Sequence, residues 1–315
     1  MKNILSDFAQ KNEELISEHG PWTAHDVYLG DGVYTLPTRN ENFPFRLKKI
    51  LQATFDICNA SPADLTVLDL GSLEGGVGIE FARHGCKVTS IEGRMANLRK
   101  GELAKEMLSL GNISFYLDDV LNVSTERYGK FDVILCLGLL YHIDSSKLFG
   151  FVQNLQRMCD RVVIFDTHIS TEDDNIEEIY HNGRQYSGAH RMEHAPNATD
   201  VEKHKQKWAS LHNNFSFWPT FSSLTNMLAD VDFTSILEIH HPYHISYKNR
   251  LMLAAICGTS RSPHFPEETL NTVNLARRPE QISAPQSTWG MAGNRSKGLV
   301  TRTLLNLYRR MKGRQ

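Results

Sequence analysis

The amino-acid sequence predicts an α/β fold built on a doubly wound, mostly parallel sheet of seven strands. Short apolar runs, several of them rich in β-branched residues, alternate with helical patterns through the middle of the chain. That alternation is typical of βαβ units whose sheet is covered by helices on both faces. The last two apolar runs lie close together across a polar turn. We therefore expect them to pair as an antiparallel hairpin at one sheet edge.

The predicted elements follow one another regularly along the chain. Residues 1–20 resemble a polar amphipathic helix that ends at Gly20-Pro21, and residues 43–59 resemble a second helix. The predicted strands are residues 65–70, 87–92, 113–118, 131–137, 161–167, 234–241 and 250–258. Helical patterns occupy residues 80–85, 94–111, 145–158 and 223–232. This order predicts an N-terminal helical segment (1–64) and a main domain (65–258).

Composition indicates an ordinary cytoplasmic protein. The chain has 315 residues, of which 41% are hydrophobic, and this is enough to form a core. The first twenty residues mix charge into every turn, unlike a signal peptide, and no run reaches the roughly 18 apolar residues of a membrane span. The cysteines are scattered, with no CxxC pair, as in free thiols of a reducing compartment. They are Cys58, Cys86, Cys136, Cys159 and Cys257.

Residues 67–78, VLDLGSLEGGVG, predict a nucleotide-binding turn. A strand that runs through a tight turn into a helix presents backbone N–H groups, and glycine lets a ligand approach them closely. An acid, Glu92, ends the next predicted strand, where it can accept hydrogen bonds from ribose hydroxyls. The combination favours a cofactor that contains a nucleoside over a plain structural corner.

The same stretch argues against a dinucleotide. A pyrophosphate needs G-x-G-x-x-G, whereas Ser72, Leu73 and Glu74 follow Gly71. We expect Glu74 to face a diphosphate with like charge. A sulfonium cofactor has no phosphate, and its amino-acid ammonium would be stabilised by a nearby carboxylate such as Asp69.

These residues resemble the motifs of class I S-adenosylmethionine-dependent methyltransferases. The first motif, an acid followed by x-G-x-G-x-G, is similar to the sequence from Asp69 to Gly75, with Leu73 in place of the central glycine; residues 131–143 resemble the fourth motif. The resemblance covers about residues 65–258 and implies a Rossmann-like methyltransferase fold with S-adenosyl-L-methionine as cofactor. The implied cofactor-binding residues are Asp69, Gly71, Ser72, Gly75, Glu92, Gly93, Asp118, Asp119, Val120, Leu137 and Gly138.

Two short stretches, residues 22–35 and 138–142, also resemble the tRNA wobble-uridine methyltransferase-like group. An enzyme that acts on tRNA should carry a basic face, because phosphate contacts supply much of its affinity. Residues 292–315 hold seven Lys or Arg and no acid; since the chain's net charge is −2, residues 1–291 carry −9. We therefore favour a small molecule or a sugar hydroxyl as acceptor. The alternatives are a tRNA wobble-uridine enzyme, a nucleotide-binding dehydrogenase and a non-catalytic binding protein.

His142 is the predicted catalytic residue. It follows the fourth predicted strand, at the carboxyl edge where ligands bind in doubly wound folds. A neutral imidazole there can take the proton of an acceptor hydroxyl. The alternative is that Tyr141 and His142 only shape the cofactor pocket. Asp166 and His168, at the end of the fifth strand, are secondary catalytic candidates.

Residues 169–218 predict a lid insertion, because they are too many for a simple crossover. The predicted substrate-binding residues are Tyr141, His190, His194 and Trp218. Residues 190–194 formally match the H-x-x-E-H metal pattern, which requires a helix and a third ligand. Neither is evident, so we favour ordinary lid histidines and no metal.

The C-terminal part predicts a linker (259–298) rich in Pro, Ser, Thr and Asn, and a basic amphipathic helix (299–315). Such a helix can lie on an anionic membrane, here the inner face of the membrane, or dock on its own domain or on a partner. The sequence does not indicate an oligomeric state.

Overall fold

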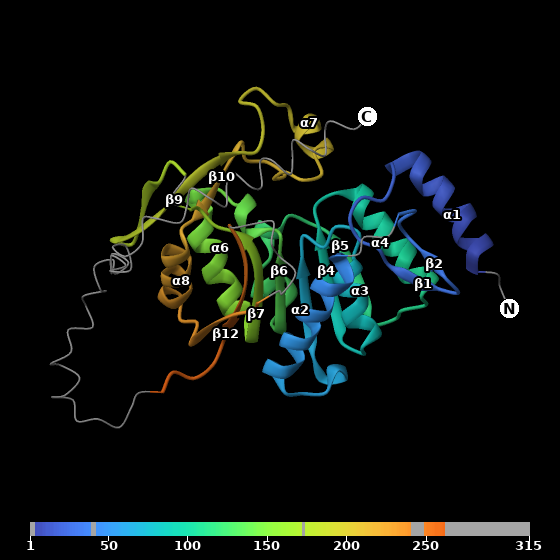
Figure 1. Ribbon diagram of the computed structural model, residues 1–315, viewed down its shortest axis with the longest axis horizontal. Helices are drawn as coiled ribbons and strands as arrows, with labels where there is room; N and C mark the ends of the chain where they lie inside the picture. The colour runs from blue at the N-terminus through green and yellow to red at the C-terminus, as the bar shows by residue number, and fades with distance from the viewer. Residues whose placement is uncertain (1–3, 39–41, 172–173, 241–248, 262–315) are drawn as a thin grey trace, which may run out of the picture. The chain divides into compact units, whose positions relative to one another are not determined.

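The computed structural model describes residues 4–38, 42–171, 174–240 and 249–261 (Figure 1). Residues 1–260 form one compact unit. The predicted linker, beyond its first three residues, and the predicted basic helix lie outside the described residues. Within the described ranges, no helix has both the length and the apolar character needed to cross a membrane.

Among the described residues, seven strands form the central sheet, in the order β11-β12-β7-β6-β3-β4-β5. The five from β7 to β5 run parallel, whereas β12 is antiparallel to β7 and β11 is antiparallel to β12. Their bounds are β3 Thr66–Leu70, β4 Lys87–Glu92, β5 Ile113–Leu117, β6 Phe131–Leu137, β7 Cys159–His168, β11 Ser235–Glu238 and β12 Arg250–Ile256. The predicted fold class and the predicted edge hairpin are confirmed.

Helices cover both faces of this sheet (Figure 1). The helices α2 (Asn42–Cys58), α3 (Gly76–Arg83) and α4 (Met95–Met107) contribute to one core, and α6 (Ser145–Met158) and α8 (Phe221–Asp230) contribute to the other. The remaining helices are α1 (Ile4–His19), which packs on α4, and the short α5 (Thr125–Tyr128) and α7 (Asp200–Lys205).

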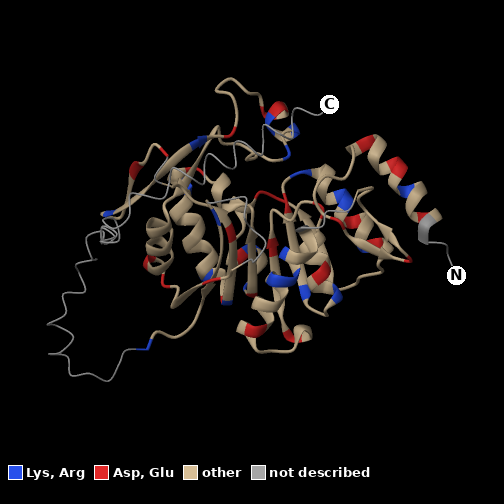
Figure 2. Ribbon diagram, viewed as in Figure 1, with Lys and Arg blue, Asp and Glu red and all other residues tan. Residues whose placement is uncertain are grey.

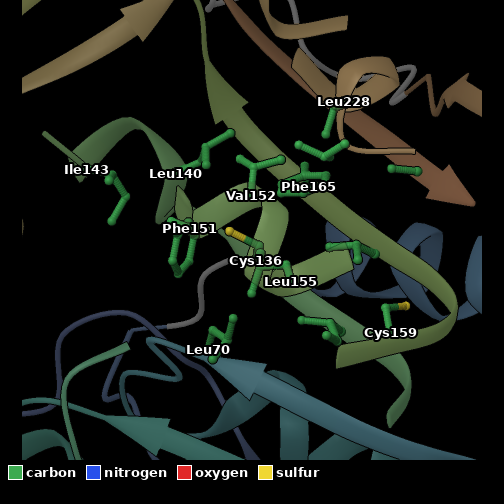
Figure 3. Packing of buried hydrophobic residues seen from close by; sticks show 14 of the residues in the cluster. Leu70, Cys136, Leu140, Ile143, Phe151, Val152, Leu155, Cys159, Phe165 and Leu228 are labelled. Atoms are coloured by element: carbon green, nitrogen blue, oxygen red, sulfur yellow. The ribbon is translucent and has the colours of Figure 1, made fainter. Parts of the chain in front are cut away.

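Each central strand divides its side chains between the two cores. In β3, Val67 belongs to the core beneath α2 and α3, while Leu68 and Leu70 belong to the core beneath α6 and α8. Figure 3 shows the second core, where Phe165 of β7 and Cys136 of β6 lie against residues of α6 such as Val152 and Leu155. This double burial explains why the strands read as continuous apolar runs.

Two small sheets were not predicted. The N-terminal segment contains a hairpin of β1 (Tyr28–Gly30) and β2 (Val33–Tyr34). The insertion contains an antiparallel sheet in the order β10-β9-β8, made of β8 (Glu177–His181), β9 (Arg184–Met192) and β10 (Phe215–Pro219). Strand β10 packs on the 3-10 turn Leu140–His142 that follows β6. The insertion therefore lies over the carboxyl edge of the central sheet.

Candidate functional site

A cavity of about 550 Å³ opens at the carboxyl ends of β3, β4 and β6. Its other walls come from the N-terminal segment 23–25, from Phe43 and Arg46 of α2, from Arg250 of β12 and from the insertion segment 207–213. Nine of the residues predicted to bind cofactor line it: Asp69, Gly71, Ser72, Glu92, Gly93, Asp119, Val120, Leu137 and Gly138. The site predicted from sequence thus gathers around one cavity.

The turn after β3 keeps its shape although Leu73 replaces a glycine. Gly71 has φ +60° and Leu73 has φ +49°, so both occupy the left-handed region. The backbone N–H of Leu73 donates to a carboxylate oxygen of Glu92 at 2.8 Å. A leucine can hold this strained conformation because the neighbouring strand end fixes it.

Two predicted cofactor residues lie behind the wall of the cavity. Gly75 caps α3 with φ +75°, and a Cβ there would come within 2.6 Å of the ring of Phe115. Asp118 accepts a hydrogen bond from the Tyr128 hydroxyl at 2.6 Å and pairs with Arg127 at 2.8 Å. Neither residue lines the cavity, and these contacts favour a supporting role for both.

The expectation that Glu74 would face a ligand phosphate is wrong. Its side chain is completely buried and accepts hydrogen bonds from the backbone N–H groups of Thr23, Ala24 and His25 at 2.6, 2.9 and 3.1 Å. Lys100 lies 3.6 Å away. Glu74 therefore anchors the N-terminal wall of the cavity and is not itself part of the lining.

Two buried carboxylates face the cavity from neighbouring strands. Burial raises the pKa of Asp69 to about 7, with a further contribution from nearby Glu92, even though the N–H of Gly78 donates to Asp69 at 3.0 Å. Burial also raises the pKa of Glu92, against the hydrogen bonds from the N–H groups of Arg94 and Leu73. The sheet edge that faces this cavity thus carries two carboxyl groups that a cationic ligand would stabilise in their ionised form.

Asp166 is held between two arginines. Its oxygens accept from the Nε atoms of Arg46 at 2.5 Å and Arg250 at 2.6 Å, and both guanidinium groups line the cavity. Burial would raise the pKa of Asp166, but the two cations hold it below its ordinary value. A carboxylate held in this way is a weak proton acceptor, so its position favours a structural role over the predicted catalytic one.

His142 forms a pair with a residue of the insertion. Both carboxylate oxygens of Glu193 lie 2.9 Å from its Nδ1, and the N–H of Ser210 also donates to Glu193 at 2.8 Å. Burial would raise the pKa of Glu193, but the contacts with His142 and Ser210 lower it, so the carboxylate is ionised. This arrangement leaves Nε2 of His142 for another partner. The sequence placed Glu193 only in a metal pattern and missed this pairing.

A second cavity of about 440 Å³ also has His142 in its lining. Tyr141, His142, Lys207, Trp208 and Ala209 line both cavities. Its other lining residues are His168, Arg191, Met192, Glu193, Gln206 and Trp218. The two cavities therefore meet at the predicted base.

Aromatic rings form one side of the second cavity. His168 stacks on Trp218 with centroids 4.8 Å apart, and Tyr141 meets both rings edge-on. Burial and the Arg250 charge lower the pKa of His168, which keeps this imidazole neutral at pH 7. The indole N–H of Trp218 donates to the carbonyl of Tyr141 at 2.9 Å. The predicted residues Tyr141, His168 and Trp218 thus lie together.

The other two predicted substrate residues do not line either cavity. His190 contacts Glu177 and the hydroxyl of Ser145, each at 3.2 Å, and buried His194 contacts the carbonyl of Ser210 at 2.8 Å. Residues 190–192 belong to β9 and are not helical. Within the described part of the chain, no group of three His, Cys, Asp or Glu side chains could hold a metal ion. The two histidines stabilise the insertion.

Arg94 binds the insertion to the strand end that carries Glu92. Its guanidinium donates to the carbonyls of His204 at 3.1 Å, Gln206 at 2.8 Å and Ala209 at 2.9 Å. Beside it, a Cβ on Gly93 would lie 2.2 Å from Leu211, which shows how closely this segment covers the turn. The insertion therefore forms part of the first cavity as well as the second one.

Comparison with known families identifies one matching model. Residues 61–217 match the family model described as "Methyltransferase domain". This range includes the five parallel strands, the first cavity's strand ends and most of the insertion.

Curated relatives match a part of the chain. A UDP-N-acetylmuramoyl-L-alanyl-D-glutamate–L-lysine ligase of Streptococcus agalactiae is 28% identical over 172 residues, 52% of this chain and 33% of the ligase. The chloroplastic magnesium protoporphyrin IX methyltransferase of Arabidopsis thaliana is 29% identical over 106 residues, 33% of each chain. The matches span about a third of the length of these relatives, and the two relatives carry different activities.

A solved structure shares the fold over most of the chain. The N-terminal domain of EvdMO1, crystallised in the presence of S-adenosylhomocysteine (SAH) and D-fucose, has a TM-score of 0.61 at 22% sequence identity. The similarity covers 80% of this chain and 97% of that domain.

Proposed function

We propose that this chain is an S-adenosylmethionine-dependent methyltransferase that methylates a hydroxyl group of a small molecule or a sugar. The match of residues 61–217 to a methyltransferase-domain model and the fold shared with a domain crystallised with SAH support the proposal. The observation that carries this proposal is the pair of His142 and Glu193 where the two cavities meet. A hydroxyl is a poor nucleophile until its proton is removed, so it needs such a base, whereas a neutral amine does not.

The first cavity suits S-adenosylmethionine. Its volume of about 550 Å³ lies in the range of small-molecule sites. Asp69 offers a carboxylate for the amino-acid ammonium, and Glu92 faces the same space for ribose hydroxyls. Gly71, Gly93 and Gly138 also line this cavity, and because they have no side chain a ligand can come close to their backbone. The cofactor supplies a methyl group that its sulfonium has already activated.

The second cavity then holds the acceptor, with its hydroxyl beside Nε2 of His142. The Nδ1–H of His142 donates a hydrogen bond to Glu193, which fixes the tautomer that presents a lone pair on Nε2. His142 takes the hydroxyl proton as the new oxygen–carbon bond forms and the carbon–sulfur bond breaks, and the electron pair of the broken bond remains on sulfur. The ionised Glu193 stabilises the imidazolium that results.

A sugar hydroxyl is the first acceptor to test. EvdMO1, whose N-terminal domain shares the fold, was crystallised in the presence of D-fucose. The aromatic wall of Tyr141, His168 and Trp218 suits the apolar face of a pyranose ring. These two points support a sugar among the small-molecule acceptors.

Two substitutions test the proposed base. We expect His142→Gln to lower kcat by roughly 10²–10⁴, the range of general bases, and to abolish the acid limb of the kcat/KM profile. Glu193→Gln should lower kcat by about 10-fold or more and change the same limb, because the imidazole loses its fixed tautomer. SAH release measures turnover, and calorimetry with SAH measures cofactor affinity, which should stay within about twofold of wild type. A native pH profile in His142→Gln would exclude the base.

The tRNA wobble-uridine assignment stays an alternative prediction. Figure 2 shows both acidic and basic residues on α1 and on α4, and residues 1–291 carry −9. Co-purification of RNA with the full chain would favour this alternative. Membrane association through residues 299–315 is a separate proposal, which flotation with anionic vesicles tests.

A further inference from the structure

The second cavity carries more cationic charge than a neutral sugar requires. Arg191 and Lys207 both line it. Lys207 donates from its ammonium to the backbone carbonyl of Pro21 at 3.3 Å, a neutral partner that leaves its charge in place. Arg191 pairs with Asp174, whose carboxylate lies outside both cavity linings. Among the described residues that line the second cavity, Glu193 is the one carboxylate, and it already forms a hydrogen bond with His142.

Two more cations lie in the first cavity, which shares His142 with the second. Arg46 and Arg250 line the first cavity and share a single carboxylate, Asp166, so the three groups together carry one positive charge. S-adenosylmethionine would bring one net positive charge, from an ammonium and a sulfonium against one carboxylate, and Asp69 and Glu92 in the lining of the first cavity offset it. The cations that remain to attract an anionic group of the acceptor are therefore Arg191 and Lys207, which line the second cavity.

Two indole rings define where the body of the acceptor lies. Trp218 is already in contact with the His168 ring and with the Arg191 guanidinium, 4.8 Å from its ring centre. Trp208 lines both cavities with 63% of its surface exposed. An exposed indole beside two cations is suited to cover the face of a ring that carries a negative substituent.

We propose that the second cavity takes an acceptor whose ring carries, besides the hydroxyl to be methylated, a carboxylate or phosphate bound by Arg191 and Lys207. The guanidinium of Arg191 can form paired hydrogen bonds to either anion, and Lys207 supplies a point charge. This inference rests on the proposed function, since it takes the first cavity for the cofactor.

Matched ligands test the charge requirement directly. Glucuronate and glucose 6-phosphate are compared with glucose, and 3,4-dihydroxybenzoate is compared with catechol, on the full chain saturated with SAH. Binding is read from quenching of Trp fluorescence, and turnover from SAH release with S-adenosylmethionine. We expect the anionic member of at least one pair to bind about tenfold or more tightly than its neutral partner. The pair that shows this difference identifies whether the site prefers a carboxylate or a phosphate.

Arg191→Gln and Asp174→Asn form the matched variants. Both remove the same ion pair, but only the first removes the cation. We expect Arg191→Gln to abolish the preference for the anion, while Asp174→Asn retains or increases it. Equal binding of the paired ligands, absence of binding by all of them, or equal loss in the two variants would overturn the inference. If the enzyme methylates a neutral acceptor, and the acid limb of its kcat/KM profile depends on His142, the proposed function is supported even though this inference is overturned.

Discussion

Asp69 gives cofactor binding a pH dependence of predictable sign. Its pKa of about 7 means that the ligand-free protein protonates this carboxyl as the pH falls below neutrality. If the cofactor ammonium binds the ionised form, the affinity for SAH is full only well above pH 7 and decreases as the pH falls through 7, by about 25-fold between pH 7.5 and 5.5. Calorimetry across this range measures the effect. The burial-lowered pKa of His25, about 4, places that group outside the window.

The control for this prediction is Asp69→Asn. An asparagine oxygen can still accept from the N–H of Gly78, so the helix contact survives while the charge is removed. SAH should bind this variant more weakly and with a flatter pH profile. An unchanged slope would assign the pH dependence to another group.

Among single residues, the sequence predicted the site residues that lie at or just after the ends of strands. Asp69 and Glu92 were predicted because they lie at the carboxyl ends of recognisable apolar runs, and His142 because it follows another such run; parallel strands end at one sheet edge. Glu193 is 51 residues from His142, and its role depends on how the insertion returns to the sheet. Arg46 and Arg250 were missed for the same reason, since their shared partner Asp166 is adjacent only in the fold.

At the scale of elements, the contact between Gly93 and Leu211 sets the position of the insertion over the cofactor. A Cβ at residue 93 would lie 2.2 Å from a Leu211 methyl, so Gly93→Ala must displace that side chain. Overpacking of this kind costs roughly 1–3 kcal/mol. We expect SAH affinity to decrease by about tenfold and SAH dissociation to become faster, as measured by calorimetry and stopped flow.

Leu211→Ala provides the compensating change. The double variant Gly93→Ala, Leu211→Ala should recover most of the affinity, because the smaller side chain gives the new methyl group room. Gly111→Ala is the neutral comparison, since a Cβ there meets no atom within 4 Å. Failure of the double variant to recover would mean that the methyl group obstructs the cofactor itself.

The strands and helices of the central sheet were predictable because the sequence pattern of each one lies within its own residues. Strands buried on both faces are apolar throughout, and α3 begins at Gly76, directly after the glycine turn. The two small sheets lack such a signal: β9, RQYSGAHRM, is mostly polar, and it is stabilised by its neighbours β8 and β10. The predicted lid was recognised from its length alone, and its share in the cofactor-side cavity required the structure.

For the whole molecule, the choice of cofactor is open to a direct stability measurement. A ligand at 100 times its Kd stabilises the native state by about 2.7 kcal/mol. SAH should therefore raise the Tm of the full chain by several degrees, whereas NAD at the same concentration should leave it unchanged, because the turn after β3 lacks G-x-G. A shift with NAD and none with SAH would favour the dehydrogenase alternative.

Most of the residues that line the second cavity belong to the insertion, so the acceptor side of the molecule can change in evolution separately from the central sheet. Arg191, Trp208 and Trp218 come from one contiguous stretch of chain, while the proposed base and the proposed cofactor contacts lie at or after the strand ends. Mutation, or exchange of that stretch between homologous genes, can change which acceptor is chosen while the methyl donor stays the same. Glu193 limits this freedom, because it belongs to the same stretch and must still reach His142. Descendants with new substrates should therefore vary around a fixed glutamate.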